Sequence, residues 1–348
     1  MSNLAHHWLS LALGHSIDTA EKALTLDIPA QHQAAYHAYD AEHVAPIRAR
    51  YELKRQAALN QYRLRLRLAI PGFLIALPLL YWLLQQLFTD LGWAFWLTLM
   101  TFSCGLFFIT RSWAQQAIAQ LNDEIEDDVF PTILAYFGND YQFNGNAYQD
   151  IQHYRQYGLL PRYDHSKFDD CLSGSYQNTR FSVQETVLTT RQTDSRGKTS
   201  YQTVFRGLFI ELTLPKSIAA TIQVKRDRGF FNAWNGFGES LQQIKREDAA
   251  FEAQFEVYSD DLKAVNQILT RDTMAQFLSL ADYFDADMQA CFQNNQLFIL
   301  LPTKHDFFEA RVNPYQAITF SRDIEQLFHE LGIIHHLIET LIIQPEAV

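Results

Sequence analysis

The sequence predicts an α+β protein. N-terminal helices and a two-helix transmembrane hairpin with a helical stalk come first, and a mostly antiparallel sheet domain with packed helices follows. Two observations carry this prediction: apolar stretches stand back to back within residues 68–110, and strand-like alternation of apolar and polar residues begins after about residue 158. Hydrophobic residues make up 48% of the 348, which is too apolar for a disordered chain. We expect four regions: an N-terminal helical region (1–67), the hairpin (68–110), a stalk helix with short helices (111–158), and an α+β domain (159–348).

The first region should be a mostly polar helix that runs into the membrane. Tyr36, Val44 and Tyr51 stand at loose helical spacing, and Pro46 is the main helix breaker. The first thirteen residues lack the basic start, long apolar run and cleavage site of a secretory signal peptide.

The hairpin consists of two apolar stretches, at about 68–88 and 91–110. Each approaches the roughly 20 residues needed to cross a hydrocarbon core, and neither contains Asp, Glu, Lys, Arg or His. Trp93, Trp96 and Trp113 lie near the ends, where amphipathic rings favour the membrane interface. The alternative is a pair of buried core helices, but such helices normally keep a polar stripe on one face, and these apolar residues cover every face.

Positive charge indicates how the hairpin is oriented. Basic residues, including Arg55, Arg63, Arg65 and Arg67, precede the first stretch, whereas the short turn carries Asp90 and no cation. The positive-inside rule therefore places both termini in the cytoplasm. The same four arginines are candidates for contact with lipid head groups, and the alternative is that they act only as topology signals.

The second apolar stretch should continue as a helix through residue 138. Ile118, Leu121, Ile125 and Val129 follow helical spacing, so this helix could pack beside residues 32–67 as a coiled-coil-like stalk. A run of five acids also falls here, and we interpret it as a solvated helix face rather than a metal or partner site: Asp123, Glu124, Glu126, Asp127 and Asp128.

The sheet domain is predicted from alternation and turn residues. Two strands should be joined by a polar loop at 194–198, and the second of them should end at Pro215. A hairpin is expected around Asn294-Asn295, and the last helix should cover Thr319 to Ile343. Further elements are expected at these ranges: strands at 174–190, 201–214, 218–225 and 251–258, and helices at 260–269 and 273–284.

Several runs of residues resemble a known family. They are Tyr157-Gly158-Leu159-Leu160-Pro161, Asp169-Asp170-Cys171-Leu172-Ser173-Gly174, Phe205-Arg206-Gly207-Leu208-Phe209, Phe251 through Asp261 (FEAQFEVYSDD) and Ile268-Leu269-Thr270. Together, over residues 40–310, they resemble the uncharacterised bacterial family DUF3137. The resemblance implies a helical N-terminal region, two membrane spans and a soluble domain in the bacterial inner membrane. It implies no activity. The chain departs from the family at Val265-Asn266-Gln267, where Ala-Arg-Tyr is expected.

Signatures of catalysis and metal binding are missing from the sequence. It contains no Walker A, GxGxxG, HExxH or GxSxG motif, and its three cysteines (Cys104, Cys171 and Cys291) form no CxxC pair. His329, His335 and His336 could share a helix face, but they stand in an apolar helix. We therefore predict no cofactor, metal or catalytic residue. The net charge of −11 argues against nucleic acid as a partner.

Paired carboxylates and an aromatic loop are the remaining candidates. Asp169-Asp170 and Asp260-Asp261 could perform acid-base work, but capping by Asp260 or Ser259 is the simpler interpretation. The Gly-rich aromatic segment 229–238 suggests a loop that binds a partner or dips into the membrane; the alternative is that its rings fold back into the core. The candidate interaction residues are Arg226, Arg228, Phe230, Phe231, Trp234 and Phe237.

These observations favour a membrane-anchored cytoplasmic interaction module that binds protein or lipid. The expected partners are membrane lipids, a protein, and a second copy of the chain. An alternative is an enzyme at the membrane surface with acids such as Asp170 and Asp260 in one cleft. A transport component is less favoured, because two spans without charge would need to oligomerise.

Overall fold

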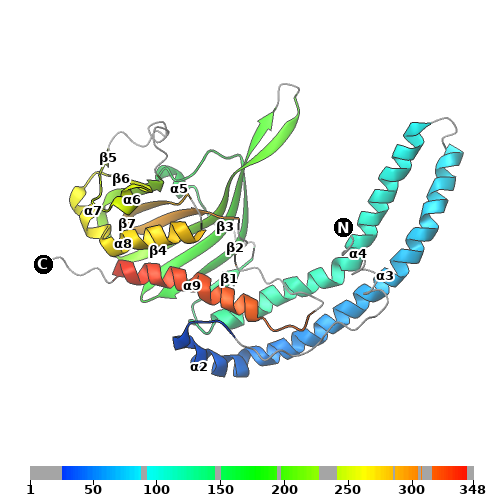
Figure 1. Cartoon of the computed structure of the whole chain (residues 1–348), viewed down its shortest axis with the longest axis horizontal. Helices are drawn as coiled ribbons and strands as arrows, with labels where there is room; N and C mark the ends of the chain where they lie inside the picture. The colour runs from blue at the N-terminus through cyan, green and yellow to red at the C-terminus, as the bar shows by residue number, and fades with distance from the viewer. Residues whose placement is uncertain are drawn as a thin grey trace. The chain divides into compact units, whose positions relative to one another are not determined.

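A computed structural model describes residues 26–87, 92–145, 150–193, 197–226, 241–284, 287–304, 307 and 316–342. The chain divides into two compact units, the first made of residues 1–129 and 310–323 and the second of residues 130–309 and 324–348. Long helices form the first unit, and a sheet with packed helices forms most of the second (Figure 1). The predicted α+β class is confirmed.

The described part of the first unit contains α2 (Ala30–Tyr39), the π-helical segment η1 (Asp40–Val44), α3 (Ala45–Leu87) and most of α4 (Trp93–Leu134). The predicted run of helix from the polar N-terminal region into the first apolar stretch is confirmed, as is the helical continuation of the second stretch. Pro71 and Pro78 lie inside α3, and membrane helices tolerate such positions.

Both long helices meet the requirements for a membrane span. The helical run Ala30–Gln86 has a mean hydropathy of 1.8 over its most apolar 18 residues, and Phe95–Asn122 reaches 1.2. In these two windows only 6% and 0% of the residues are buried, whereas core helices would be largely buried. The exposed large side chains are Leu68, Ile70, Leu74, Ile75, Leu79, Trp82 and Leu83 on α3, and Trp96, Leu97, Met100, Phe102, Phe107, Phe108 and Ile109 on α4.

Outside the apolar stretches, α3 and α4 pack side by side. The buried hydroxyl of Tyr51 lies 2.7 Å from the backbone oxygen of Glu124 and 2.6 Å from the carboxylate of Asp128. Arg50 pairs with the same Asp128 at 2.9 Å, and Lys54 pairs with Glu124. Two acids of the predicted acidic run therefore face cations of α3, although both stay half exposed. Closer to the apolar stretches, the helices share a small core formed by Leu59, Tyr62, Leu66, Ala114 and Ile118.

A segment from late in the sequence also belongs to the first unit. The backbone N–H of Ile318 donates to the carboxylate of Glu52 at 3.1 Å, and the Nε of Arg48 donates to the backbone oxygen of Thr319 at 3.1 Å. Residues 316–320 are thus fixed on α3 by polar contacts.

The second unit contains an antiparallel sheet of seven described strands. They are β1 (Gln142–Asn144), β2 (His165–Tyr176), β3 (Thr179–Thr193), β4 (Thr199–Arg226), β5 (Gln242–Gln243), β6 (Phe255–Ser259) and β7 (Gln289–Pro302). Their order is β1-β2-β3-β4-β6-β5, and β7 pairs with β4. The polar loop predicted at 194–198 does join paired strands, because Thr193 lies opposite Thr199.

Two predicted strand breaks are wrong. Pro215 lies inside β4, and the predicted hairpin around Asn294-Asn295 is part of the single strand β7. The two interruptions face each other, since the β4–β7 register shifts between Thr213 and Ile218 and again before Ile222. Asn294 has a positive φ of 55°. A β-bulge absorbs turn residues without reversing the chain, so both strands continue.

Helices cover the two faces of the sheet unequally. The helices α8 (Arg271–Phe284) and α9 (Ser321–Ile342) cross one face (Figure 1), where the ring of Phe277 on α8 lies 6.1 Å from that of Phe292 on β7. The short helix α5 (His153–Gln156) packs on the opposite face. The predicted final helix at 319–343 is confirmed by α9. Two short helices, α6 (Ala249–Glu252) and α7 (Leu262–Ile268), flank β6, so the strand predicted from Phe251 begins only at Phe255.

Candidate functional site

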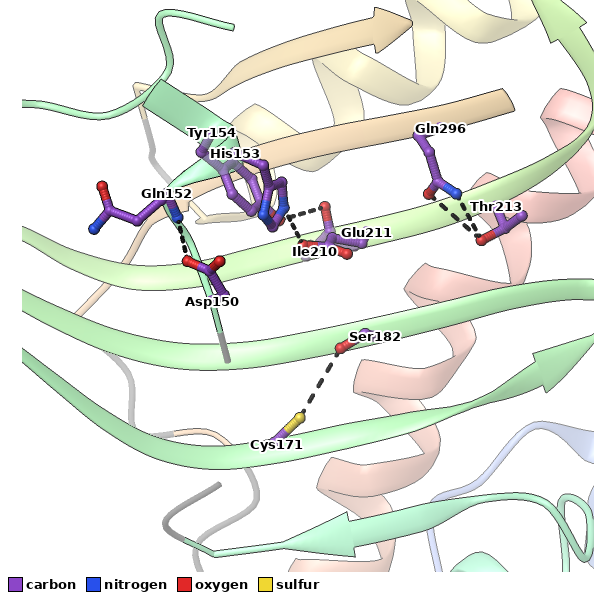
Figure 2. Close-up of polar contacts among 10 residues, drawn as sticks. All are labelled: Asp150, Gln152, His153, Tyr154, Cys171, Ser182, Ile210, Glu211, Thr213 and Gln296. Atoms are coloured by element: carbon purple, nitrogen blue, oxygen red, sulfur yellow. Dashed lines mark hydrogen bonds and ion pairs between the residues drawn. The ribbon is translucent and has the colours of Figure 1, made fainter. Parts of the chain in front are cut away.

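A polar contact holds α5 against the sheet. The Nε2 of His153 lies 2.8 Å from the carboxylate of Glu211 on β4, and the hydroxyl of Tyr154 points to the backbone oxygen of Ile210 at 3.5 Å (Figure 2). The ring of Tyr154 packs edge-on against Phe209, with 4.7 Å between centroids. Burial and the nearby Glu211 raise the pKa of Tyr154 well above its ordinary value, so its hydroxyl remains a hydrogen-bond donor. We assign this group a positioning role for α5.

Beyond α5, the same face carries small polar side chains. Thr213 on β4 and Gln296 on β7 are hydrogen bonded across the strands at 3.2 Å, and the Sγ of Cys171 lies 3.9 Å from the hydroxyl of Ser182 (Figure 2). Burial raises the pKa of the Cys171 thiol. Because the thiolate is the nucleophilic form, this cysteine is poorly suited to covalent chemistry.

A two-stranded arm extends from the sheet (Figure 1), and most of its described residues are exposed. We define the β3–β4 arm as residues 189–193 and 199–204, whose strands pair from Thr189–Thr203 to Thr193–Thr199. Among the described strands, only β3 pairs with β4 over this stretch, because β7 joins β4 from Gly207 onward. The side chain of Tyr201 is 62% exposed and that of Val204 is 37% exposed.

The base of the arm is fixed by Asp164. Its carboxylate accepts hydrogen bonds from the hydroxyl of Thr190 at 2.9 Å and the backbone N–H of Arg191 at 2.7 Å. The hydrogen bonds from the backbone N–H of Arg191 and from the hydroxyl of Thr190 lower the pKa of Asp164. Its carboxylate therefore stays charged in neutral solution. The ring of Tyr201 lies 5.3 Å from that of His165 at the start of β2. These contacts hold the arm at its base.

The acids considered for catalysis do not converge. Asp170 on β2 lies beside Gln184 of β3, which pairs with Phe209 of β4, whereas Asp260 accepts from the N–H of Thr221 further along β4. On β7 the partners of Phe209 and Ile222 are Leu300 and Phe292, and strand geometry puts these roughly 26 Å apart. The cleft that the enzyme alternative requires therefore does not form between these two acids.

The predicted helix capping is present, but the capping residue is Asp261 rather than Asp260 or Ser259. Asp261 caps α7, because its carboxylate accepts from the N–H groups of Lys263 and Ala264. Ser259 accepts from the N–H of Asp261, and Asp260 accepts from the N–H of Thr221 on β4.

The three histidines of α9 have separate partners. His335 stacks on Tyr176 with 3.9 Å between ring centroids, and its Nε2 lies 2.7 Å from the hydroxyl of Tyr141. His336 contacts Gln276 on α8, whereas the ring of His329 lies 4.8 Å from that of Tyr283.

The predicted interaction residues fall in two groups. Arg228, Phe230, Phe231, Trp234 and Phe237 lie outside the described residues. Arg226, at the end of β4, donates to the side chain of Gln254 at 3.0 Å and lies 3.8 Å from the carboxylate of Asp287.

The predicted lipid-facing flank needs one correction. Arg55 is 3% exposed and its guanidinium binds Glu52 at 2.5 Å, so it is not available to lipid head groups. Arg65 lies over the ring of Trp113, 5.4 Å from its centroid, and donates to the backbone oxygen of Trp113. Arg63 is half-buried and Arg67 is exposed.

The sequence predicts the turn of the arm but not the arm as a candidate site. One feature of the sequence does indicate strands that are not packed on a core. Residues 189–193 and 199–203 are polar at nearly every position (TTRQT and TSYQT), whereas a strand on a packed face alternates with apolar residues.

No curated protein matches the chain. One solved structure is similar, the crystal structure of the mycobacterial trehalose monomycolate transport factor A, TtfA, at 10% identity and a TM-score of 0.31, over 58% of this chain and 88% of that one. Residues 203–342 match the family model described as a protein of unknown function, DUF3137. The resemblance read from the sequence is thereby confirmed over this stretch, and residues 203–342 form a DUF3137 region.

Proposed function

We propose that this protein is a membrane-anchored interaction module that binds a protein partner through the β3–β4 arm. In this proposal α3 and α4 cross the bacterial inner membrane as a hairpin, with both termini and the second unit in the cytoplasm. The partner would be a protein with a strand or a shallow apolar surface that the arm can reach.

The apolar surface of the hairpin supports the membrane part. Side chains such as Leu79 and Leu97 are 57% and 60% exposed, and contiguous apolar surface of this kind is rare on soluble monomers. Arg65, Arg67 and Arg111 flank the apolar stretches at the end away from the turn, as the positive-inside rule requires for cytoplasmic termini. Where α3 and α4 leave the membrane together, their paired residues would form the stalk.

The arm is the single observation that carries the binding part. A two-stranded ribbon is at best marginally stable in water, yet β3 and β4 remain paired for seven residue pairs past Gly207, where β7 stops pairing with β4. Exposed strand edges are usually protected by lysine, proline or bulges. A register shift between Leu188 and Thr189 marks an irregularity where the arm begins. Beyond it the arm strands carry threonine, serine and glutamine at most positions, so their edges are suited to pairing with a partner strand.

The enzyme alternative has less support. It needs convergent acids, and Asp170 and Asp260 lie beside positions of β4 that are roughly 26 Å apart along the strand. The thiol of Cys171 is a weak nucleophile because burial raises its pKa.

Site-specific photo-crosslinking in cells tests the proposal. A photoreactive residue at Tyr201, on the arm, should give a discrete crosslinked protein adduct. The same residue at Tyr283 on α8, which is 54% exposed and thus a matched control, should not. Equal adducts at both positions, or none at Tyr201, would contradict the assignment of the arm as the binding element.

A further inference from the structure

A second candidate site lies on the second unit, at a hollow of about 810 Å³. It is formed by the segment 245–249, by α7 and by the start of α8. Its apolar lining residues are Leu262, Leu269 and Met274. The hollow lies in the part of the chain that carries the FEAQFEVYSDD and Ile-Leu-Thr runs, yet no role follows from the family for these residues.

Three cations line this hollow: Lys245, Arg246 and Arg271. The guanidinium of Arg246 is held by two neutral acceptors, the side-chain oxygen of Asn266 at 2.6 Å and the backbone oxygen of Leu269 at 3.0 Å. These two bonds fix the orientation of the guanidinium, and its buried Nε is not accessible to a ligand. A fixed planar guanidinium on the lining of a hollow is well suited to a planar or tetrahedral oxyanion.

The carboxylates near the hollow form no ion pair with these cations. Asp248 lines it, but its carboxylate caps α6 by accepting from the N–H of Phe251 at 2.9 Å. Glu247 also lines it and is exposed, and Asp272 lies in the first turn of α8. Glu252 lies outside the lining, and its carboxylate accepts from the backbone N–H of Arg246 at 2.9 Å. No described carboxylate forms an ion pair with the side chain of any of the three cations.

Backbone donors add to the cations. The helix α8 has 14 residues and begins at the hollow. The hydroxyl of Thr270 accepts from the N–H of Thr273 at 3.2 Å, which leaves the N–H groups of Arg271 and Asp272 without a partner inside the helix. Amide groups at a helix start favour anions.

We propose that this hollow binds the phosphoryl group of a phosphate monoester, with Arg246 and Arg271 as its main contacts. The monoester could be a free phosphate compound or the head group of a lipid such as phosphatidic acid. The site is separate from the β3–β4 arm, so either assignment can fail without the other.

Calorimetry on the full chain in phosphatidylcholine nanodiscs tests the free source, with inorganic phosphate as the probe. Binding should be saturable, and Arg246→Gln and Arg271→Gln should each weaken it by about tenfold. Lys263→Gln is the matched control, because Lys263 is exposed on α7 and does not line the hollow. Since Arg271 is exposed, its variant should fold even if loss of the Arg246 hydrogen bonds disturbs the structure.

Nanodiscs that contain phosphatidic acid distinguish the lipid source. Binding to these discs alone, lost in the same two variants and kept in Lys263→Gln, would assign the site to a lipid head group. The proposal is overturned if neither probe binds, or if both arginine variants bind as tightly as the native chain.

Discussion

The carboxylate of Glu52 on α3 accepts a hydrogen bond of 3.1 Å from the backbone N–H of Ile318, which lies 266 positions further along the chain. Burial of this carboxyl group acts to raise its pKa. The hydrogen bonds from Arg55, from Ile318 and from Gln56 more than offset that effect and lower the pKa of Glu52 to about 2. The ionised side chain of Glu52 thus binds the segment before α9 to α3.

We predict that this tie weakens in acid. The pKa of Glu52 is lower in the folded chain than its ordinary value of 4.5, so the unfolded state binds more protons between these two values. Its contribution is complete above about pH 4.5 and is lost as the pH falls toward 2. Hydrogen exchange at the Ile318 amide, corrected for the intrinsic rate, should accelerate over that window. Glu52→Gln should accelerate it already at pH 7, and Glu42→Gln, an exposed control on η1, should not.

Gly207→Ala should destabilise the second unit. A Cβ at this position would lie 2.1 Å from the backbone oxygen of Leu301 on β7, and a backbone atom in a paired strand cannot move aside easily. We expect a loss of about 3 kcal/mol in the free energy of unfolding, measured by denaturant titration of the full chain in detergent.

A second glycine provides the control for this measurement. Gly332 on α9 has no atom within 4 Å of its would-be Cβ. Gly332→Ala should therefore be neutral or stabilise by up to about 1 kcal/mol. Equal effects of the two variants would contradict the close approach of β4 and β7.

The buried amine of Lys225 on β4 should make the stability of the second unit rise as the pH increases above 7. Desolvation lowers the pKa of this amine to about 7, against the opposing influence of Cys291 and Glu256. Between pH 7 and 8.5 the unfolded state therefore binds more protons than the folded one, and stability rises with pH. Lys225→Met should remove this slope. A thermal unfolding midpoint that shows the same pH dependence in both proteins would contradict the buried environment of the amine.

Charge placed on the apolar surface of the hairpin should prevent membrane insertion. Arginine near the centre of a span costs about 2.5–3.5 kcal/mol per residue on insertion scales. The double variant Leu79→Arg with Leu97→Arg should therefore shift from the fraction that resists alkaline extraction into the soluble or degraded fraction. Leu53→Arg is the control, because Leu53 is 69% exposed on α3 but lies outside the apolar stretch. If the double variant were as resistant to extraction as the native chain, the hairpin would not be a membrane anchor.

Some elements of the fold could be predicted from the sequence and others could not. The long helices and α9 follow from periodicity, because apolar spacing and burial coincide in them. The continuity of β4 and β7 could not be predicted, since Pro215 and Asn294-Asn295 are ordinary turn signals and only their position opposite each other turns them into a bulge. Arg55 shows a different limit: its charge predicts a lipid-facing position, whereas the packed structure buries its side chain beside Glu52, three positions earlier on α3.

The candidate sites also depended on tertiary structure. The arm sequence is polar and unremarkable until the register shows how far it continues past β7. Arg246 and Arg271 are 25 positions apart, and no local pattern connects them before α7 and α8 form the hollow.

In the proposed function, an anchored module holds a protein partner by the β3–β4 arm. The most direct test replaces residues 191–201 with Asn-Gly, a two-residue turn that can close the pair Thr190–Gln202. Crosslinked cells would be solubilised in mild detergent, and the proteins that co-purify with the native and shortened chains compared. We predict a stoichiometric partner on the native chain that is lost from the shortened one, while both remain in the membrane fraction. The same partner on both chains would contradict the account.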